Sequence, residues 1–405
     1  MTTMIAPTTP ATDSLVKVIR SDEEALGVVR RLSAEFRQGA IERDRDRTLP
    51  TSEIDRLTEE GFFGIAVPRE FGGAFVSAET ITESFRLISA ADPSIGQIPQ
   101  NHFCWLPLFS NGTPEQADFF YRRILAGDRI GNAHSEDTRK RPGDYQHTLE
   151  KVDGGWVVSG RKYYSTGAIF AQWIPFIAPD LEGRQSMFFV EASTPGVTVI
   201  NDWQGMGQRT TASGTTVFDK VFIPDFNVFP FISEGPTNRV RMLLASLIHA
   251  AIDQGIAEEV LEDAGNYIRD ANRPWIDNPY EEHAKEPFVI KEFGELAVTV
   301  RTAGVSLKHA ARSVDKARAN PTDETVLEAR LAIADARINT GNAATRISDQ
   351  FFTLTGARAT LEKHALDRHW RNARTHSLHD PFRWKHFHLG NYYLNGIVPG
   401  PRTYI

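Results

Sequence analysis

The sequence has few of the features that mark secreted, membrane-bound or nucleic-acid-binding proteins. Its 405 residues include one cysteine, Cys104, so no disulfide can form within the chain and we expect a reducing compartment, the cytoplasm by default. No uninterrupted apolar run approaches the roughly 20 residues that cross a bilayer, which argues against a membrane protein. A formal net charge of −7 and a pI near 6.0 lack the basic excess that nucleic-acid binding requires.

The composition is that of an ordinary globular protein. Hydrophobic residues make up 41% of the chain and charged residues 24%, and the length allows two or three domains with a large core. Residues 1–14 are rich in Thr, Pro and Ala, with no basic region before a long apolar run. We therefore expect a disordered leader, not a signal or transit peptide.

Residues 15–129 are predicted to form a mostly helical N-terminal domain. Apolar residues recur there at helical spacing, as in Ala25, Val28, Val29 and Leu32. Glycine and proline punctuation then divides the block into short helices and turns.

Residues 130–235 are predicted to form a middle β domain of barrel-like character. Two strand-like runs, Tyr145–Val152 and Trp156–Tyr164, flank an Asp-Gly-Gly turn, which is typical of a hairpin. Further strand-like runs are Ser186–Glu191, Gly196–Ile200 and Thr215–Ile223.

Residues 236–405 return to helical spacing and predict a C-terminal four-helix bundle with a tail. The expected helices are Arg239–Ala271, Val289–Ala319, Glu324–Leu354 and Ala359–His376. Pro381 disfavours helical geometry at the residue before it, so the last helix should end near Asp380. The predicted fold class is therefore α+β, mainly α.

The segment from Arg368 to Asp380 is unusually polar for the end of a chain. It carries three arginines, three histidines and an aspartate, next to a cluster of aromatic residues. His376 and His379 are three residues apart and share one face of a helix. This helix end is the strongest candidate for a polar active site.

Five segments in chain order carry a resemblance to a known family. They are Val67–Gly73, Ala91–Gly96, Gly131–Glu136, Gly205–Gly214 and Arg374–Pro381. With them the chain resembles the acyl-CoA dehydrogenase fold over nearly its whole length. Within that fold it is most similar to the flavin monooxygenases that oxygenate organosulfur compounds, the dibenzothiophene monooxygenase group, and in particular to the sulfur-acquisition oxidoreductases.

The resemblance implies catalytic roles for His379 and His376. Dehydrogenases of this fold remove an α-proton with a glutamate near the C-terminus. The run that carries it aligns with His379-Asp380-Pro381-Phe382, so the carboxylate is a methylene shorter and a proline replaces the small glycine, which argues against thioester dehydrogenation. In the monooxygenase branch a histidine at the position of His379 lies near the reactive edge of the flavin. Its near-neutral pKa suits it to hold or supply a proton, with His376 in support.

The resemblance also implies the residues that hold the flavin. Those facing the isoalloxazine ring are Asn132, Ser135, Tyr164 and Thr166. Arg273 and Arg358 match positions that bind the cofactor phosphate, partly from a neighbouring subunit, and guanidinium groups suit phosphate oxygens. The implied cofactor is FMN, used as reduced FMNH2, in preference to FAD, and the implied assembly is a homotetramer.

Three residues are expected to line the substrate pocket: Asn101, His102 and Trp203. Where the sulfur-ring oxygenases have a tyrosine in a Gly-Tyr-His step, this chain has Asn101 before His102. This difference favours a small sulfide, sulfoxide or sulfone over a fused aromatic thiophene.

The sequence offers no site for a nicotinamide dinucleotide. A dinucleotide fold needs G-x-G-x-x-G between a strand and a helix, and the Gly-Met-Gly run at 205–207 lacks both that context and the third glycine. Reduced FMN is then expected from a separate NAD(P)H:flavin reductase. The chain would react it with O2 and protect the resulting flavin C4a-hydroperoxide from water.

Four other functions compete with this assignment. The main rival is a true FAD-dependent acyl-CoA dehydrogenase. A metal cluster at His376, His379 and Asp380, with His386 and His388, matches no recognised zinc motif. A serine hydrolase lacks its G-x-S-x-G elbow, and a non-catalytic helical scaffold leaves the C-terminal Arg and His density without a purpose.

Overall fold

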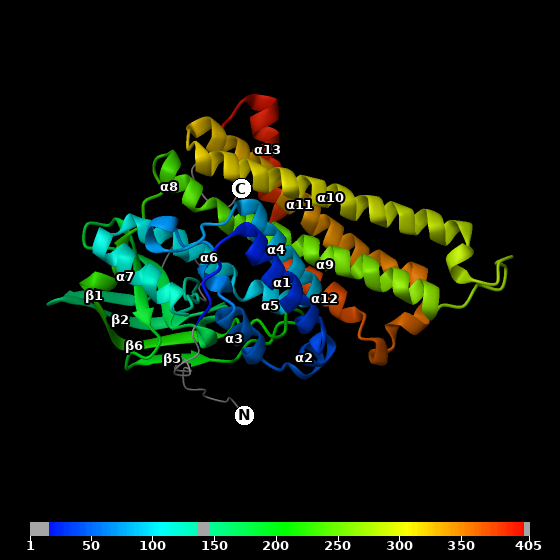
Figure 1. Cartoon of the computed structure of the whole chain (residues 1–405), viewed down its shortest axis with the longest axis horizontal. Coiled ribbons are helices and arrows are strands. Elements are labelled where there is room, and N and C mark those ends of the chain that lie inside the picture. The colour runs from blue at the N-terminus through cyan, green and yellow to red at the C-terminus, as the bar shows by residue number, and fades with distance from the viewer. Residues whose placement is uncertain (1–15, 137–145, 401–405) are drawn as a thin grey trace.

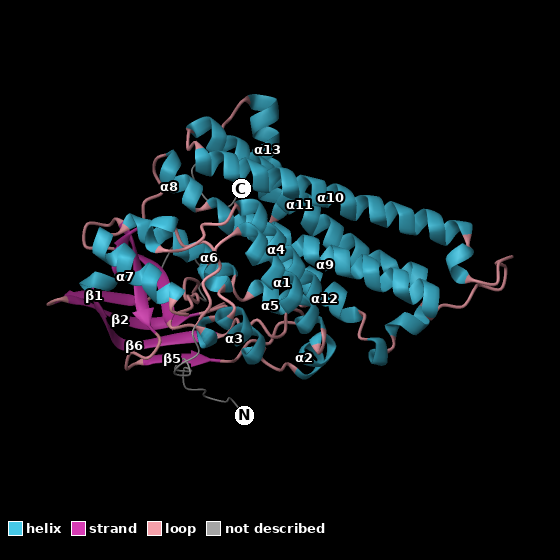
Figure 2. Cartoon of the chain, in the orientation of Figure 1, coloured by secondary structure: helices cyan, strands magenta, loops and turns pink. Residues whose placement is uncertain are grey.

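The structure is a computed structural model that describes residues 16–136 and 146–400. The expected leader at 1–14 lies outside the described residues. Figure 1 shows the strands gathered at one end of the molecule and the longest helices extending toward the other, with the N-terminal helices between them. Figure 2 shows how small the sheet region is beside the helices, in agreement with a mainly α member of the α+β class.

The N-terminal region consists of short helices, as predicted. They are α1 (Asp22–Arg37), α2 (Ala40–Asp46), α3 (Thr51–Glu59), α4 (Ala78–Ala91), α5 (Pro93–Gln97), α6 (Gln100–Trp105) and α7 (Pro114–Leu125). The Ser21 side chain caps α1 by accepting from the backbone N–H of Glu24. The helically spaced Ala25, Val29 and Leu32 are completely buried, so the apolar stripe fixes which face of α1 meets the core.

The middle region contains two antiparallel sheets. Their strands are β1 (Thr148–Val152), β2 (Gly155–Lys162), β3 (Trp173–Pro179), β4 (Gln185–Glu191), β5 (Val197–Ile200), β6 (Thr215–Pro224) and β7 (Val228–Pro230). One sheet has the order β1-β2-β6-β5 and the other β3-β4-β7. Alternating residues such as Val158, Phe176 and Phe188 fill a separate core between the sheets.

Two of these strands, β3 and β7, were missed in the sequence. Both contain proline, which lowers the strand signal because it cannot donate to a ladder. In β3 the carbonyl of Pro175 accepts from the Ala133 backbone N–H at 3.0 Å. This position of the strand therefore uses the carbonyl, which proline retains.

The C-terminal region is built on long helices. They are α8 (Pro236–Arg241), α9 (Leu243–Asp270), α10 (Pro287–Ala319), α11 (Asp323–Thr355), α12 (Asp367–Ser377) and α13 (Phe382–Asn395). The 35-residue stretch Pro236–Asp270 is long and apolar enough to cross a membrane by length and composition alone, but 72% of its most apolar window is buried inside the protein. Such burial is typical of the core helix of a bundle.

Two expectations for the end of the chain were wrong. Short 3₁₀ turns at Ala357–Thr360 and Glu362–His364 replace the expected start of the last helix, so α12 begins only at Asp367. The helix α12 ends at Ser377, before Pro381, and a further helix that was not expected, α13, starts directly after this proline. Proline is well tolerated at a helix start, where its missing N–H has no partner to lose.

Candidate active site

Three histidines gather where α9 meets α12. His376, only 1% exposed, holds its Nδ1 2.5 Å from Oδ1 of Asp253 on α9. Its Nε2 lies 3.1 Å from Nδ1 of His249, one helical turn before Asp253. The His249 ring in turn packs against His379, with 3.9 Å between ring centroids. The structure thus brings together the two histidines predicted to be catalytic and adds a third.

A buried line of charges supports this cluster. The guanidinium of Arg337 on α11 lies between the carboxylates of Asp253 and Asp380, and Lys385 on α13 pairs with the second oxygen of Asp380. Burial raises the pKa of Asp380, but the charges of Arg337 and Lys385 outweigh it and hold that pKa below its usual range. Both carboxylate oxygens are therefore occupied, and Asp380 is not free to act as the α-proton base of a dehydrogenase.

His379 is exposed on one side, and its ring has no hydrogen bond to the described residues. Protein surrounds it on the other sides. This desolvation, helped by the nearby His376 and Arg337, lowers its pKa to about 4. The near-neutral pKa expected from the sequence is therefore wrong. At pH 7 the ring is neutral, with one nitrogen that donates and one that accepts.

A chain of polar contacts joins the β region to α12. The Thr166 hydroxyl lies 2.7 Å from that of Ser213, in the loop 205–214 between β5 and β6. In the same loop the backbone N–H of Gln208 donates to Oδ1 of Asn372 at 2.6 Å. Asn372 lies one turn before His376 on α12. The expected flavin-binding Thr166 and the histidine cluster thus lie on two sides of one junction.

The other residues expected to face the flavin ring lie together at the edge of the β region. Nδ2 of Asn132 donates to the Tyr164 carbonyl at 3.3 Å, and Ser135 forms a β-bridge with the residue before Tyr164. Tyr164 has a φ of +52° and is 62% exposed, with its ring edge-on to Trp203 at 6.2 Å. Held in this uncommon conformation, it presents an aromatic face outward.

This donor set fits an isoalloxazine ring. Amide and hydroxyl groups are the neutral donors and acceptors that the ring needs, and an open aromatic face can pack against it. Two buried hydroxyls near the junction, Ser165 Oγ and Thr375 Oγ1, have no hydrogen-bond partner among the described residues. Such orphaned groups are costly unless a ligand or water satisfies them.

Arg273 and Arg358 lie elsewhere. Both are exposed, at the end of the bundle where Nδ2 of Asn272 donates to the carbonyl of Leu354 at 2.9 Å. Figure 1 shows this end of α9 and α11 pointing away from the strands. Within one chain these arginines do not reach Asn132 or Thr166.

The expectation that His102 lines a substrate pocket is wrong. It is fully buried; its Nε2 donates to the Phe63 carbonyl at 2.9 Å and its Nδ1 accepts from the Ile130 N–H at 3.1 Å. Burial lowers its pKa to about 3. His102 therefore ties the helical region to the β region and has no nitrogen left for a substrate. Asn101 is only partly buried, and the indole of Trp203 donates to the Gln208 carbonyl at 2.9 Å.

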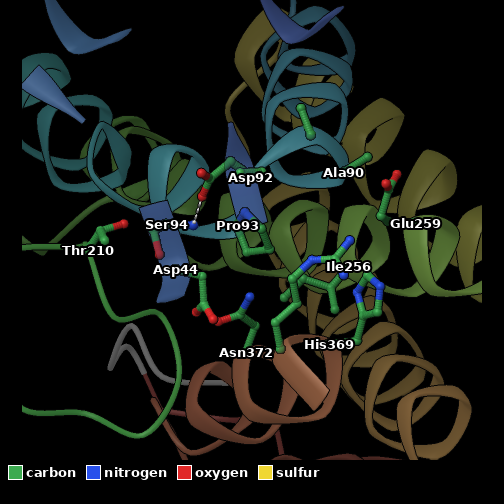
Figure 3. Close-up of a pocket in the computed structure, with 13 residues that line it drawn as sticks. Asp44, Ala90, Asp92, Pro93, Ser94, Thr210, Ile256, Glu259, His369 and Asn372 are labelled. Carbon is green, nitrogen blue, oxygen red and sulfur yellow. Dashed lines mark hydrogen bonds between the residues drawn. The ribbon is translucent and has the colours of Figure 1, made fainter. Parts of the chain in front are cut away.

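Figure 3 shows a second, polar pocket at the junction of α2, α4, α5, α9, α12 and the 205–214 loop. Its wall includes Asp44, Asp92, Glu259, His369 and Asn372, and none of the site residues predicted from the sequence lines it. Burial raises the pKa of Glu259 to about 7, and its Oε2 has no partner among the described residues.

The sequence reasoning missed His249, Asp253 and Arg337. A usable signal was present, because His249 and Asp253 are four residues apart in the mostly apolar first part of α9, Leu243–Asp253. They therefore share a buried face, and polar residues are rarely buried without partners. Across residues 16–136 and 146–400, no group of three or more His, Cys, Asp or Glu side chains is arranged to hold a metal ion.

The fold and junction define a protein of the acyl-CoA dehydrogenase fold. Family descriptions match along the chain: "Acyl-CoA dehydrogenase, N-terminal domain" at 22–128, "middle domain" at 136–221 and "C-terminal domain" at 247–384. Within this fold the chain belongs to the flavin-dependent monooxygenases of the dibenzothiophene monooxygenase group.

The relatives that place it there match nearly end to end. Dibenzothiophene monooxygenase from Rhodococcus erythropolis is 32% identical, over 94% of this chain and 95% of the relative. The probable FMNH2-dependent monooxygenase SfnC from Pseudomonas putida is 31% identical, over 94% and 97%. The relatives' shared activity makes this chain a flavin-dependent monooxygenase.

Solved structures agree. Methanesulfinate monooxygenase MsuC from Pseudomonas fluorescens superposes with a TM-score of 0.87 at 29% identity, covering 94% of this chain and 99% of the other. FMN-bound TdsC from Paenibacillus sp. A11-2 gives 0.89 at 28% identity, covering 94% and 100%. FMN is therefore the cofactor, as the sequence resemblance implied.

Proposed function

We propose that the chain is the oxygenase of a two-component system. A separate NAD(P)H:flavin reductase supplies FMNH2 in the cytoplasm, and the chain uses it with O2, through a flavin C4a-hydroperoxide, to oxygenate a small organosulfur compound for sulfur acquisition. The observation that carries the proposal is the junction itself. The neutral imidazole of His379 lies at this junction, and the carboxylate at the dehydrogenase base position, Asp380, is paired with both Arg337 and Lys385.

Bound reduced flavin supplies the electrons and the site of reaction with O2. The chain's own residues provide the surroundings. Asn132 and Thr166 offer neutral hydrogen bonds that orient the ring, and Tyr164 and Trp203 cover it. His379, uncharged at pH 7 and open on one side, holds a proton at the reactive edge without introducing a charge that would destabilise an oxygenating group.

We propose a small sulfide, sulfoxide or sulfone as substrate. Asn101 stands where sulfur-ring oxygenases have a tyrosine, and its amide offers a donor and an acceptor instead of an aromatic face. The relatives described as methanesulfinate and dibenzothiophene monooxygenases show that this fold accepts both small and fused-ring sulfur compounds. The polar Asn101 favours the small, oxygen-bearing class.

The arrangement of Arg273 and Arg358 supports a homotetramer. Both lie exposed at the far end of the bundle, so they can bind the flavin phosphate only of a neighbouring copy. The exposed Trp275 and Ile276 beside Arg273 add apolar surface that such a neighbour would cover.

The test is an anaerobic stopped-flow mix of the protein and FMNH2 with oxygenated buffer, followed by product analysis with small sulfones, sulfoxides and sulfides. We expect a long-lived flavin adduct absorbance and an oxygenated sulfur product. His379→Ala should lower oxygenation by about 100-fold or more, the usual contribution of a positioned proton-handling group. The exposed His386 on α13 provides a matched control, and His386→Ala should retain activity.

Two results would count against the proposal. Full activity of His379→Ala would remove the role of this histidine. Bleaching of bound oxidised flavin by an acyl-CoA thioester would instead identify an FAD-dependent or FMN-dependent dehydrogenase.

A further inference from the structure

The hydrogen bonds of the histidine cluster fix which ring nitrogens carry protons. The Asp253 carboxylate can only accept, so Nδ1 of His376 must be the donor at 2.5 Å. With a single proton on each ring, Nε2 of His376 accepts from Nδ1–H of His249 at 3.1 Å, and this is the arrangement that the tautomer measurement below tests. Nε2 of His249 is consequently a bare acceptor, and it has no hydrogen-bond partner among the described residues.

His249 lies between the helix α6, which carries the expected substrate-pocket residue Asn101, and His379. Nε2 of Gln100 on α6 donates to the Ala245 carbonyl at 3.1 Å, one turn before His249, so the helix that carries Asn101 packs beside it. On its other side the His249 ring contacts His379. His249 is buried, which excludes a role as an ordinary surface histidine.

We propose that His249 is a catalytic residue of the oxygenation reaction, with Asp253 and Arg337 as its positioning residues. Nε2 of His249 accepts a hydrogen bond from a proton held at the reactive edge, and the line Asp253–His376–His249 keeps that nitrogen unprotonated. This inference rests on the proposed function, because it assigns a role within the same reaction.

The charges around the cluster support this assignment. Asp253 from α9, Arg337 from α11, Asp380 between α12 and α13, and Lys385 from α13 form two buried ion pairs in a row, so their charges balance. Burial first, and then the positive charges of Arg337 and Lys385, keep the pKa of His249 well below its usual value. The ring therefore stays neutral, and its acceptor is present throughout the physiological pH range.

Two variants separate the inner hydrogen bond from the outer acceptor. In His249→Asn the amide nitrogen stands near the original Nδ1 and can still donate to His376, but the Nε2 acceptor is gone. In Asp253→Asn the amide can donate to Nδ1 of His376, which reverses both rings and leaves a proton on Nε2 of His249. The same reversal explains the loss of activity in the Asp-to-Asn variant of a serine protease triad.

Asp263→Asn provides a matched control. Asp263 binds Nε2 of His369 at 2.8 Å, so it forms another Asp–His pair between the same two helices, α9 and α12. That pair lies two to three turns further along α9, at the wall of the separate polar pocket.

The experiment combines three measurements. Ring ¹⁵N spectra of histidine-labelled, flavin-free protein report the tautomers; FMN fluorescence quenching reports the Kd; and product formed per O2 consumed reports coupling. We expect Nδ1–H tautomers for His249 and His376 in the wild type and Nε2–H tautomers in Asp253→Asn. Both His249→Asn and Asp253→Asn should lower coupling by about 100-fold or more, with the double variant no worse than either single variant and the Kd within twofold. Asp263→Asn should remain coupled.

If His249→Asn still couples O2 consumption to oxygenation while His379→Ala does not, the inference is overturned and the proposed function stays intact. An Nε2–H tautomer at His249 in the wild type would also overturn it. A wild type that oxygenates no sulfur compound would overturn the proposed function and the catalytic role together. If Asp253→Asn does not fold, His249→Asn and the wild-type spectra decide the matter.

Discussion

Replacing Arg337 with methionine tests the buried line of charges most directly. The guanidinium side chain is 1% exposed and bridges Asp253 and Asp380. Its removal leaves Asp253 with His376 and Asp380 with Lys385, and each carboxylate loses its strongest buried partner. Breaking a buried ion pair on one side costs about 3–5 kcal/mol, because the remaining charge cannot be solvated. For a unit the size of the C-terminal bundle this corresponds to a melting point lower by about 6–20 °C.

The assay is calorimetry of flavin-free protein, which reports the unfolding midpoint without assuming two-state behaviour of the whole chain. Arg337→Lys keeps the charge but cannot reach both carboxylates with a planar fork, so we expect an intermediate midpoint. Arg122→Met removes an exposed arginine that pairs with Asp118 on α7, and its midpoint should match that of the wild type.

A small effect would refute the reasoning. If Arg337→Met lowers the midpoint no more than Arg122→Met does, the carboxylates of Asp253 and Asp380 are not held in a water-free environment. Water at Asp253 could then also hydrogen-bond His376, and the tautomers of His376 and His249 would no longer be fixed.

Three further predictions concern other parts of the molecule. Burial raises the pKa of Glu259 from 4.5 to about 7, so ionisation of this carboxyl destabilises the fold as the pH rises through that window. Glu259→Gln should therefore raise the free energy of unfolding by up to about 3 kcal/mol at pH 8 and by little at pH 4.5, and equal melting points of variant and wild type at pH 8 would contradict this. A Cβ at Gly207 would lie 1.9 Å from the Arg371 carbonyl oxygen, so Gly207→Ala should displace the 205–214 loop from α12 and weaken FMN binding. A Kd for FMN equal to that of the wild type would show that the loop does not position the flavin site. Arg273→Ala and Arg358→Ala should each raise the Kd for FMN by roughly 10-fold or more, as expected for losing a charge-assisted hydrogen bond, with unchanged melting points; normal affinity in both would remove them from the phosphate site.

Local pattern was enough to predict most of the fold. The period of 3.6 in α1 and in the long C-terminal helices, and the hairpin turn between β1 and β2, are set by each segment's own residues. The strand β3 was missed because its prolines, Pro175 and Pro179, cannot donate to a ladder and so weaken the ordinary strand signal. The helix α13 was missed because Pro381 was interpreted as the end of helical structure, not as a helix start.

The histidines of the C-terminal segment could be found from the sequence, but their chemistry could not. Spacing predicted that His376 and His379 share one face of a helix, but α12 ends at Ser377 and His379 lies in the turn that follows it. The pKa of His379 depends on how much protein surrounds it, which no local pattern encodes. The same limit applies to His102, whose motif suggested a pocket although both its ring nitrogens are used in packing the helical region onto the β region.

By itself, then, the sequence determined most of the secondary structure, the order of the three regions and the family, because these depend on neighbouring residues and on motifs in a fixed order. Only the tertiary structure decided that His249 and Asp253 from α9, Arg337 from α11 and His376 from α12 act as one unit. Helical periodicity states which side chains share a face of their own helix. It does not state which other helix packs on that face, and the balance of desolvation and charge that makes these groups neutral or paired exists only after the helices meet.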